Sequence, residues 1–171
     1  GMPNRQQGWK QASKNFKIAG IRTSTSATNT NLTITYRLQE TNSKYHVSYT
    51  LCPSGMIHVA CHLETQPDVP ELPRIGVRFR IPTDMNQLEY LGRGPEENYC
   101  DRNNGTFIGH YKSTAEQQYV PYVRPQENGH KTETRWLALT DKTGKGLLFI
   151  ADSNFMEFNV SHNRIEDFDG E

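Results

Sequence analysis

The sequence lacks any apolar run long enough to cross a membrane, and it lacks an excess of charge of either sign. A membrane-spanning helix takes about 20 consecutive apolar residues, and no stretch of the 171 residues approaches that length. Nineteen Lys and Arg residues balance nineteen Asp and Glu residues, so no positive surplus attracts a polyanion. These absences predict a soluble protein with neither a nucleic-acid partner nor a membrane partner.

Cysteine is also scarce, and its spacing does not suggest a metal site. Cys52, Cys61 and Cys100 are odd in number and are interpreted as ordinary thiols, although a bridge between one pair stays open if the protein is exported. His58 and His62 share one face of an expected strand. Four residues of rise place them about 13 Å apart, which is too far for two ligands of one metal ion. We therefore expect no cofactor bound by this chain.

Helical periodicity is rare, whereas apolar and polar residues alternate with period two, as in strands with one buried face. The predicted strands are 32–38, 45–51, 57–63, 75–81, 88–91, 136–139, 147–150 and 155–160, and the pattern is less regular at 107–111 and 118–123, which are also predicted as strands. Short helices are candidates only at 9–13 and 113–118, and three prolines within 65–73 predict a linker. Many short strands between turns predict an all-β fold, an antiparallel β-sandwich.

No catalytic motif can be read from the spacing of nucleophiles, acids and bases. The sequence has no nucleophile elbow and no glycine-rich phosphate loop before a helix. Glu96 and Glu97 are adjacent, but a retaining glycosidase needs two carboxylates about 5–5.5 Å apart across a sugar, which sequence adjacency does not supply. We expect one of the two to pair instead with Arg93 or Arg102.

Two segments stand out by their Gly, Pro and Asn content: 91–102, Leu-Gly-Arg-Gly-Pro-Glu-Glu-Asn-Tyr-Cys-Asp-Arg, and 121–129, Pro-Tyr-Val-Arg-Pro-Gln-Glu-Asn-Gly. Such residues shape tight loops. A sugar site would need aromatic faces beside fixed polar groups. The candidates are Tyr99, Tyr119, Tyr122 and Trp136, beside Arg102, Glu127, Asn128 and Arg135. Rigid loop corners and buried tyrosines with satisfied hydroxyls explain the same residues equally well.

Three motifs resemble the C-terminal β-sandwich domain of the large bacterial β-galactosidases of glycoside hydrolase family 2. They are Pro-Arg-Ile-Gly at 73–76 and the segments 91–102 and 121–129, and their order and spacing match that domain. Trp-Lys-Gln-Ala at 9–12 resembles the segment by which the domain begins. The resemblance implies the galactose-mutarotase-like supersandwich. This chain is shorter than the complete domain, so strands of the second sheet are expected to be missing.

The domain boundaries follow from the same resemblance. Gly1 in front of Met2 is interpreted as a remnant of tag removal, and residues 1–8 are predicted to be this remnant and a disordered start. Residues 9–171 are predicted to form a single domain of a larger enzyme. The compartment stays open, cytoplasmic or periplasmic in a bacterium.

The resemblance also implies a function for the parent enzyme. In that family a central TIM barrel, with two glutamates and bound Mg and Na ions, hydrolyses terminal β-galactosides with retention, and none of that barrel is in this chain. The chain alone is therefore expected to be inactive, and to support the barrel and the assembly of subunits. Its expected partners are the barrel and other domains of the parent, the galactoside substrate of the parent, and other copies in a homo-oligomer.

The residues expected to bind substrate or a neighbouring domain lie on the two motif segments and beside them. They are Arg93, Glu96, Asn98, Arg102, Tyr122, Glu127, Asn128 and Arg135. Two alternatives stay open. A free-standing carbohydrate-binding module would need an exposed aromatic platform that holds sugar without the barrel. A mutarotase-like sugar epimerase would share the fold, but no motif here matches the mutarotase histidines and carboxylates.

Overall fold

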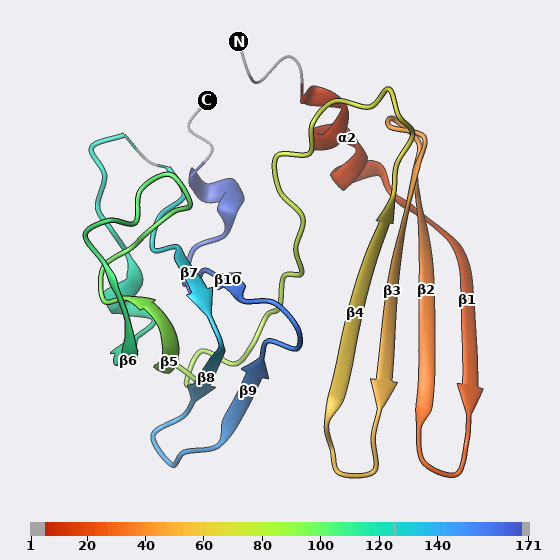
Figure 1. The fold of residues 1–171 in the computed structure, drawn as a ribbon. Coiled ribbons are helices and arrows are strands. Elements are labelled where there is room, and N and C mark those ends of the chain that lie inside the picture. The colour runs from red at the N-terminus through yellow and green to blue at the C-terminus, as the bar shows by residue number, and fades with distance from the viewer. Residues whose placement is uncertain (1–5, 125, 169–171) are drawn as a thin grey trace. The chain divides into compact units, whose positions relative to one another are not determined.

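The computed structural model describes residues 6–124 and 126–168, and the chain divides into two compact units between Arg78 and Phe79. Both units are built mainly from antiparallel sheets (Figure 1). The all-β antiparallel sandwich class predicted from the sequence is confirmed. The predicted start over 1–8 and single domain over 9–171 stay predictions. Residues 1–5, Pro125 and residues 169–171, which those predictions include, lie outside the described residues.

In its described residues, 6–78, unit 1 has one helix and a four-stranded sheet. The elements are α2 (Gln7–Asn15), β1 (Lys17–Thr25), β2 (Thr30–Leu38), β3 (Ser43–Leu51) and β4 (Ile57–Glu64). The strands lie in the order β1-β2-β3-β4, each antiparallel to the next (Figure 1). Strands β2 to β4 confirm the three predicted strands at 32–63, and β1 extends them. Strand β1 escaped prediction because a register shift between Ile18 and Gly20 interrupts its alternation.

Helix α2 confirms the helix predicted at 9–13 and contacts the proline-rich linker. The helix buries Trp9 and Ala12, which lie on one face because they are three residues apart. The Nε1 of Trp9 donates a hydrogen bond to the carbonyl oxygen of Pro70 at 2.8 Å, so this helix holds the linker predicted at 65–73. Among the described residues, no helix is both long and apolar enough to cross a membrane.

The described part of unit 2 has a four-stranded and a two-stranded sheet. The larger sheet has the order β6-β5-β8-β9, with β5 (Gln87–Gly94), β6 (Phe107–Thr114), β8 (Trp136–Thr140) and β9 (Gly146–Ile150). The smaller sheet pairs β7 (Lys131–Thr134) with β10 (Met156–Phe158), and the short 3-10 helices are η1 (Glu116–Gln118) and η2 (Ile165–Phe168). These strands confirm the predictions at 88–91, 107–111, 136–139, 147–150 and 155–160. The helix predicted at 113–118 is reduced to η1.

The core of unit 2 lies on one face of the larger sheet. Leu88, Tyr90, Leu137 and Leu139 are buried together there, because alternate residues of β5 and β8 point to the same side. The ring of Phe158 in β10 packs edge-on against Tyr90, with the ring centroids 5.2 Å apart. This core fixes the strands from which the two motif segments extend.

Two of the predicted strands are wrong. Residues 75–81 keep their alternation of apolar and arginine side chains, but they form no strand within the described part of the chain. Alternation indicates a one-sided environment and does not create a partner strand. Residues 118–123 form no strand either. There the N–H of Val120 donates to the side chain of Asn128, and Pro121 has no N–H to donate.

Candidate functional site

The two motif segments come together in unit 2 through the carboxylate of Glu97. The first loop (95–106) joins β5 to β6, and the second loop (119–130) joins η1 to β7. Glu97 Oε1 accepts hydrogen bonds from Arg102 Nη2 at 2.7 Å and from the Tyr122 hydroxyl. Glu97 Oε2 accepts one from the N–H of Gly129 at 2.8 Å. The predicted pairing of a glutamate with Arg102 is thereby confirmed, and its carboxylate belongs to both loops.

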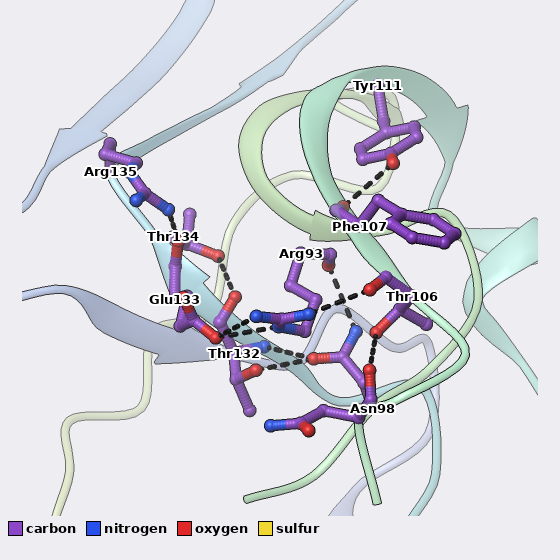
Figure 2. A network of polar contacts seen from close by, with 10 residues as sticks. Arg93, Asn98, Thr106, Phe107, Tyr111, Thr132, Glu133, Thr134 and Arg135 are labelled. Atoms are coloured by element: carbon purple, nitrogen blue, oxygen red, sulfur yellow. Dashed lines mark hydrogen bonds and ion pairs between the residues drawn. The ribbon is translucent and has the colours of Figure 1, made fainter.

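Asn98, next to Glu97 in the first loop, is buried at the centre of a second set of contacts, which Figure 2 shows. Its Nδ2 donates to the carbonyl oxygens of Arg93 and Glu96, both at 3.0 Å. Its Oδ1 accepts from the N–H of Thr132 at 2.9 Å and from the Thr132 hydroxyl at 2.6 Å. Its own N–H donates to the carbonyl oxygen of His130 at 2.8 Å. The side chain of Asn98, which is 0% exposed, therefore ties the first loop to β5 and β7. We call Glu97, Asn98, Arg102, Tyr122 and Gly129 the two-loop network.

Arg93 extends this network along β5. Its Nε donates to Glu133 Oε1 at 2.7 Å and its Nη1 to the carbonyl oxygen of Thr106 at 2.8 Å (Figure 2). Arg93 therefore pairs with a carboxylate of β7 and not with either glutamate of the first loop. Arg135, between β7 and β8, donates to the carbonyl oxygen of Glu133, and its guanidinium lies 3.9 Å from the ring centroid of Phe155.

Asn128 closes the second loop on itself. Its Oδ1 accepts from the N–H of Val120, and its Nδ2 donates to the carbonyl oxygen of Gln126, both at 3.0 Å. The neighbouring Glu127 contributes its carbonyl oxygen, which accepts from the Tyr99 hydroxyl at 3.3 Å. The side chain of Asn128 thus binds two backbone groups of the loop, the N–H of Val120 and the carbonyl oxygen of Gln126, which in a strand would pair with a neighbouring strand.

Tyr99 and His130 stack between the loops, with ring centroids 5.0 Å apart and planes 19° apart. His130 Nδ1 lies 2.6 Å from Asn159 Oδ1, and Nε2 lies 3.0 Å from Glu157 Oε2. Burial, with help from the nearby carboxylate of Glu97, raises the pKa of Tyr99 to about 12, so this phenol stays protonated at neutral pH. These contacts join the second loop to the segment around β10.

Lys131 is a buried cation beside the network. The residue is 2% exposed, and its Nζ lies 3.3 Å from the carbonyl oxygen of Gly129, to which it donates. Burial lowers the pKa of Lys131 to about 8 from its ordinary 10.5, against the opposing attraction of Glu97 and Glu96. The charged form is thus held in the folded protein at a free-energy cost.

Replacing Lys131 by methionine is expected to raise the free energy of unfolding at pH 7 by about 1–3 kcal/mol. The unfolded chain binds a proton at Lys131 up to about pH 10.5, whereas the folded chain releases it near pH 8. Stability of the original chain should therefore rise as the pH rises through this interval, and this rise should vanish in Lys131→Met. Urea unfolding at pH 7 and pH 10 measures both effects. The exposed Lys142→Met serves as control, and equal pH profiles for all three proteins would contradict the interpretation.

Three residues that hold the loops together are absent from the site predicted from the sequence: Glu97, His130 and Glu133. The sequence indicates Glu97 only as a possible ion-pair partner. His130 and Glu133 follow the second motif in a polar run without a recognisable pattern. Of the predicted residues, the structure brings Arg102, Tyr122 and Asn98 into the two-loop network. Among the aromatic candidates, Tyr119 stacks on Phe168 with ring centroids 6.4 Å apart, and Trp136 lies beside His110 with ring centroids 5.5 Å apart.

The predicted substrate or interdomain role of the eight loop residues stays a prediction. Chemically, the arrangement offers hydrogen-bonded side chains that already have partners within the chain. Across the described ranges, no three His, Cys, Asp or Glu side chains are grouped so that they could hold a metal ion.

Comparison with known proteins relates this chain to beta-galactosidases. Residues 2–171 match the family described as "Beta galactosidase small chain". The chain is similar to a beta-galactosidase of Priestia megaterium, 33% identical over 144 residues, which covers 84% of this chain and 14% of that relative. It is also similar to a beta-galactosidase of Streptococcus thermophilus, 29% identical over 167 residues, which covers 97% of this chain and 16% of that relative. The chain therefore corresponds to about a sixth or less of the length of these relatives.

Proposed function

This chain belongs to the beta-galactosidase small-chain family, and from that membership we propose that it is a non-catalytic supporting domain of a β-galactosidase. The parent enzyme hydrolyses terminal β-galactosides, and the groups that break the glycosidic bond lie in the larger part of the polypeptide. The magnesium and sodium ions implied by the family resemblance belong to that part as well. The work of this domain is to support the barrel active site and the contacts between subunits.

The observation that carries this proposal is the two-loop network. The carboxylate of Glu97 accepts three hydrogen bonds. Both polar atoms of the Asn98 side chain, Nδ2 and Oδ1, form hydrogen bonds within the chain. A glycosidase acid must instead present its proton to the glycosidic oxygen, with a second carboxylate about 5–5.5 Å away across the sugar in the retaining case. Side chains committed to internal bonds hold loop shape, which is what a supporting surface requires.

Replacing Asn128 by alanine tests whether the second loop supports the fold or binds the sugar. The change removes the acceptor for the Val120 N–H, so we expect a loss of about 1–2 kcal/mol and a thermal midpoint lower by about 2–8 °C in this chain. In the complete enzyme, the KM for a chromogenic β-galactoside should stay unchanged. Gln126→Ala, at an exposed position of the same loop, is the matched control. An unchanged midpoint together with a raised KM would assign Asn128 to the substrate and refute the supporting role.

A further inference from the structure

Two Asn-Gly dipeptides lie in unit 2: Asn104–Gly105 is in the first loop, and Asn128–Gly129 is in the second. Asparagine loses its side-chain amide most readily in front of glycine, because the glycine nitrogen has no neighbouring Cβ that hinders its approach to the asparagine side chain. The two dipeptides are identical in sequence, so the structure around each of them decides whether this reaction takes place.

The peptide bond between Asn128 and Gly129 is held from both sides. Its carbonyl oxygen accepts a hydrogen bond from Asn159 Nδ2 at 2.7 Å, and its N–H donates to Glu97 Oε2 at 2.8 Å. Both polar atoms of the Asn128 side chain are also hydrogen-bonded to the backbone of the second loop. Turning the Gly129 nitrogen onto Cγ of Asn128 requires bonds of this set to break, so this dipeptide is protected.

The peptide bond between Asn104 and Gly105 is not held in this way. The N–H of Thr106 donates to the carbonyl oxygen of Asn103 at 3.1 Å, which makes Asn104 and Gly105 the two central residues of a β-turn. Both are exposed, and among the residues that the structure describes neither has a hydrogen-bond partner. A Cβ built on Gly105 would meet no atom within 4 Å, so the backbone has room to rotate here.

We propose that Asn104 is a site of spontaneous deamidation, whereas Asn128 is protected from it. The N–H of Gly105 loses its proton to hydroxide, and the nitrogen then forms a bond to Cγ of Asn104. The bond from Cγ to the side-chain amide nitrogen breaks, and ammonia leaves with a proton from water. Water opens the resulting succinimide ring at one of its two C–N bonds. Opening at Cγ gives aspartate, and opening at the backbone carbonyl carbon gives isoaspartate, in which the backbone continues through Cγ.

Isoaspartate at position 104 changes the first loop more than aspartate does. It lengthens the backbone of the turn by one methylene, between the two residues whose hydrogen bond closes the turn, Asn103 and Thr106. Thr106 is buried, and its carbonyl oxygen accepts a hydrogen bond from Arg93 Nη1 at 2.8 Å. The longer turn therefore displaces a partner of Arg93. Aspartate leaves the backbone unchanged and adds a negative charge at an exposed position.

Incubation of the 171-residue chain in mildly alkaline buffer, folded and in urea, tests the proposal. Peptide mass spectrometry measures the conversion of each asparagine, which is divided by its conversion in urea, where both dipeptides are free. We expect the folded rate of Asn104 to be within about threefold of its rate in urea, and that of Asn128 to be at least about tenfold below its own. Equal protection of the two asparagines, or better protection of Asn104, overturns the proposal.

Gly105→Ala tests whether the following backbone nitrogen carries out the attack. Gly105 does not have a positive φ, and an added Cβ meets no atom, so this variant should unfold at the same temperature as the original chain. Conversion of Asn104 should nevertheless fall by about tenfold or more, because the added methyl group hinders the approach of the nitrogen to Cγ. Unchanged conversion in Gly105→Ala contradicts the succinimide route, and so does a product that contains aspartate but no isoaspartate.

Asn104→Asp separates the added charge from the longer backbone. This variant should keep the thermal midpoint of the original chain, because position 104 is exposed and the turn keeps its length. The isoaspartate form, purified by ion exchange from the incubated chain, should unfold at a temperature about 2–8 °C lower. Equal midpoints of the isoaspartate form and of Asn104→Asp would show that the turn accommodates the methylene without displacing Thr106, and would overturn this part of the proposal.

Discussion

Asn98→Ala is expected to lower the free energy of unfolding of this chain by about 3–5 kcal/mol, and its thermal midpoint by about 6–20 °C. The substitution leaves the carbonyl oxygens of Arg93 and Glu96 without the donor Nδ2 of Asn98. It also removes the oxygen that accepts hydrogen bonds from the N–H and the hydroxyl of Thr132. Each unsatisfied buried group costs about 1–3 kcal/mol, and local relaxation makes the total smaller than the sum. Urea and thermal unfolding followed by circular dichroism measure the loss.

Two further variants sharpen this test. Asn104→Ala removes the same side chain at an exposed position of the first loop, and it should change stability by no more than about 0.5 kcal/mol. Asn98→Asp keeps the shape of the side chain and an oxygen for Thr132, but loses the two donated bonds and buries a charge. If Asn98→Asp unfolds at the same midpoint as the original chain, the hydrogen-bond explanation is wrong.

The sequence predicted the strands well where apolar and polar side chains alternate along the whole strand. Apolar and polar residues alternate along β2 and along β3, and the register pairs every residue of the two strands, from Thr30 with Leu51 to Leu38 with Ser43. Strand β1 was missed because its bulge shifts the alternation by one residue. Residues 75–81 show the opposite error. Their apolar and polar residues alternate regularly, but no described strand forms backbone hydrogen bonds with them, so they are not a strand. Periodicity therefore predicts faces reliably and pairing only indirectly.

The site was less predictable than the fold, for a reason that lies in its long-range contacts. The motif 91–102 indicated a shaped loop and a glutamate paired with an arginine, and both are present. Sequence reasoning did not choose between Glu96 and Glu97, because the choice depends on Tyr122 and Gly129, about 25 to 32 residues further along the chain. The same holds for Asn98, whose burial is created by β7. Local composition thus identified the loops, whereas tertiary contacts decided which side chains hold them together.

Gly129→Ala is expected to lower the free energy of unfolding by about 3–4 kcal/mol. Gly129 has a φ of 75°, in the left-handed region, where a side chain alone costs about 1–2 kcal/mol. A Cβ at this position would also collide with the carbonyl oxygen of Gln118, which is main chain and cannot rotate away. Shifting the backbone to relieve this collision would pull the Gly129 N–H from Glu97 Oε2 and loosen the two-loop network.

Gly144→Ala provides the matched control for Gly129→Ala, because it isolates the cost of backbone conformation. Gly144 has a φ of 84°, but an added Cβ there meets no atom within 4 Å. We therefore expect Gly144→Ala to cost only about 1–2 kcal/mol, with the excess loss in Gly129→Ala arising from crowding and from the bond to Glu97. Urea unfolding of the two variants at one pH measures the difference, and equal losses would refute the crowding argument. Both roles account for the Glu-Asn-Gly at the end of segment 121–129: Asn128 closes the loop, and glycine is the residue that can donate to Glu97 while lying close to the carbonyl oxygen of Gln118.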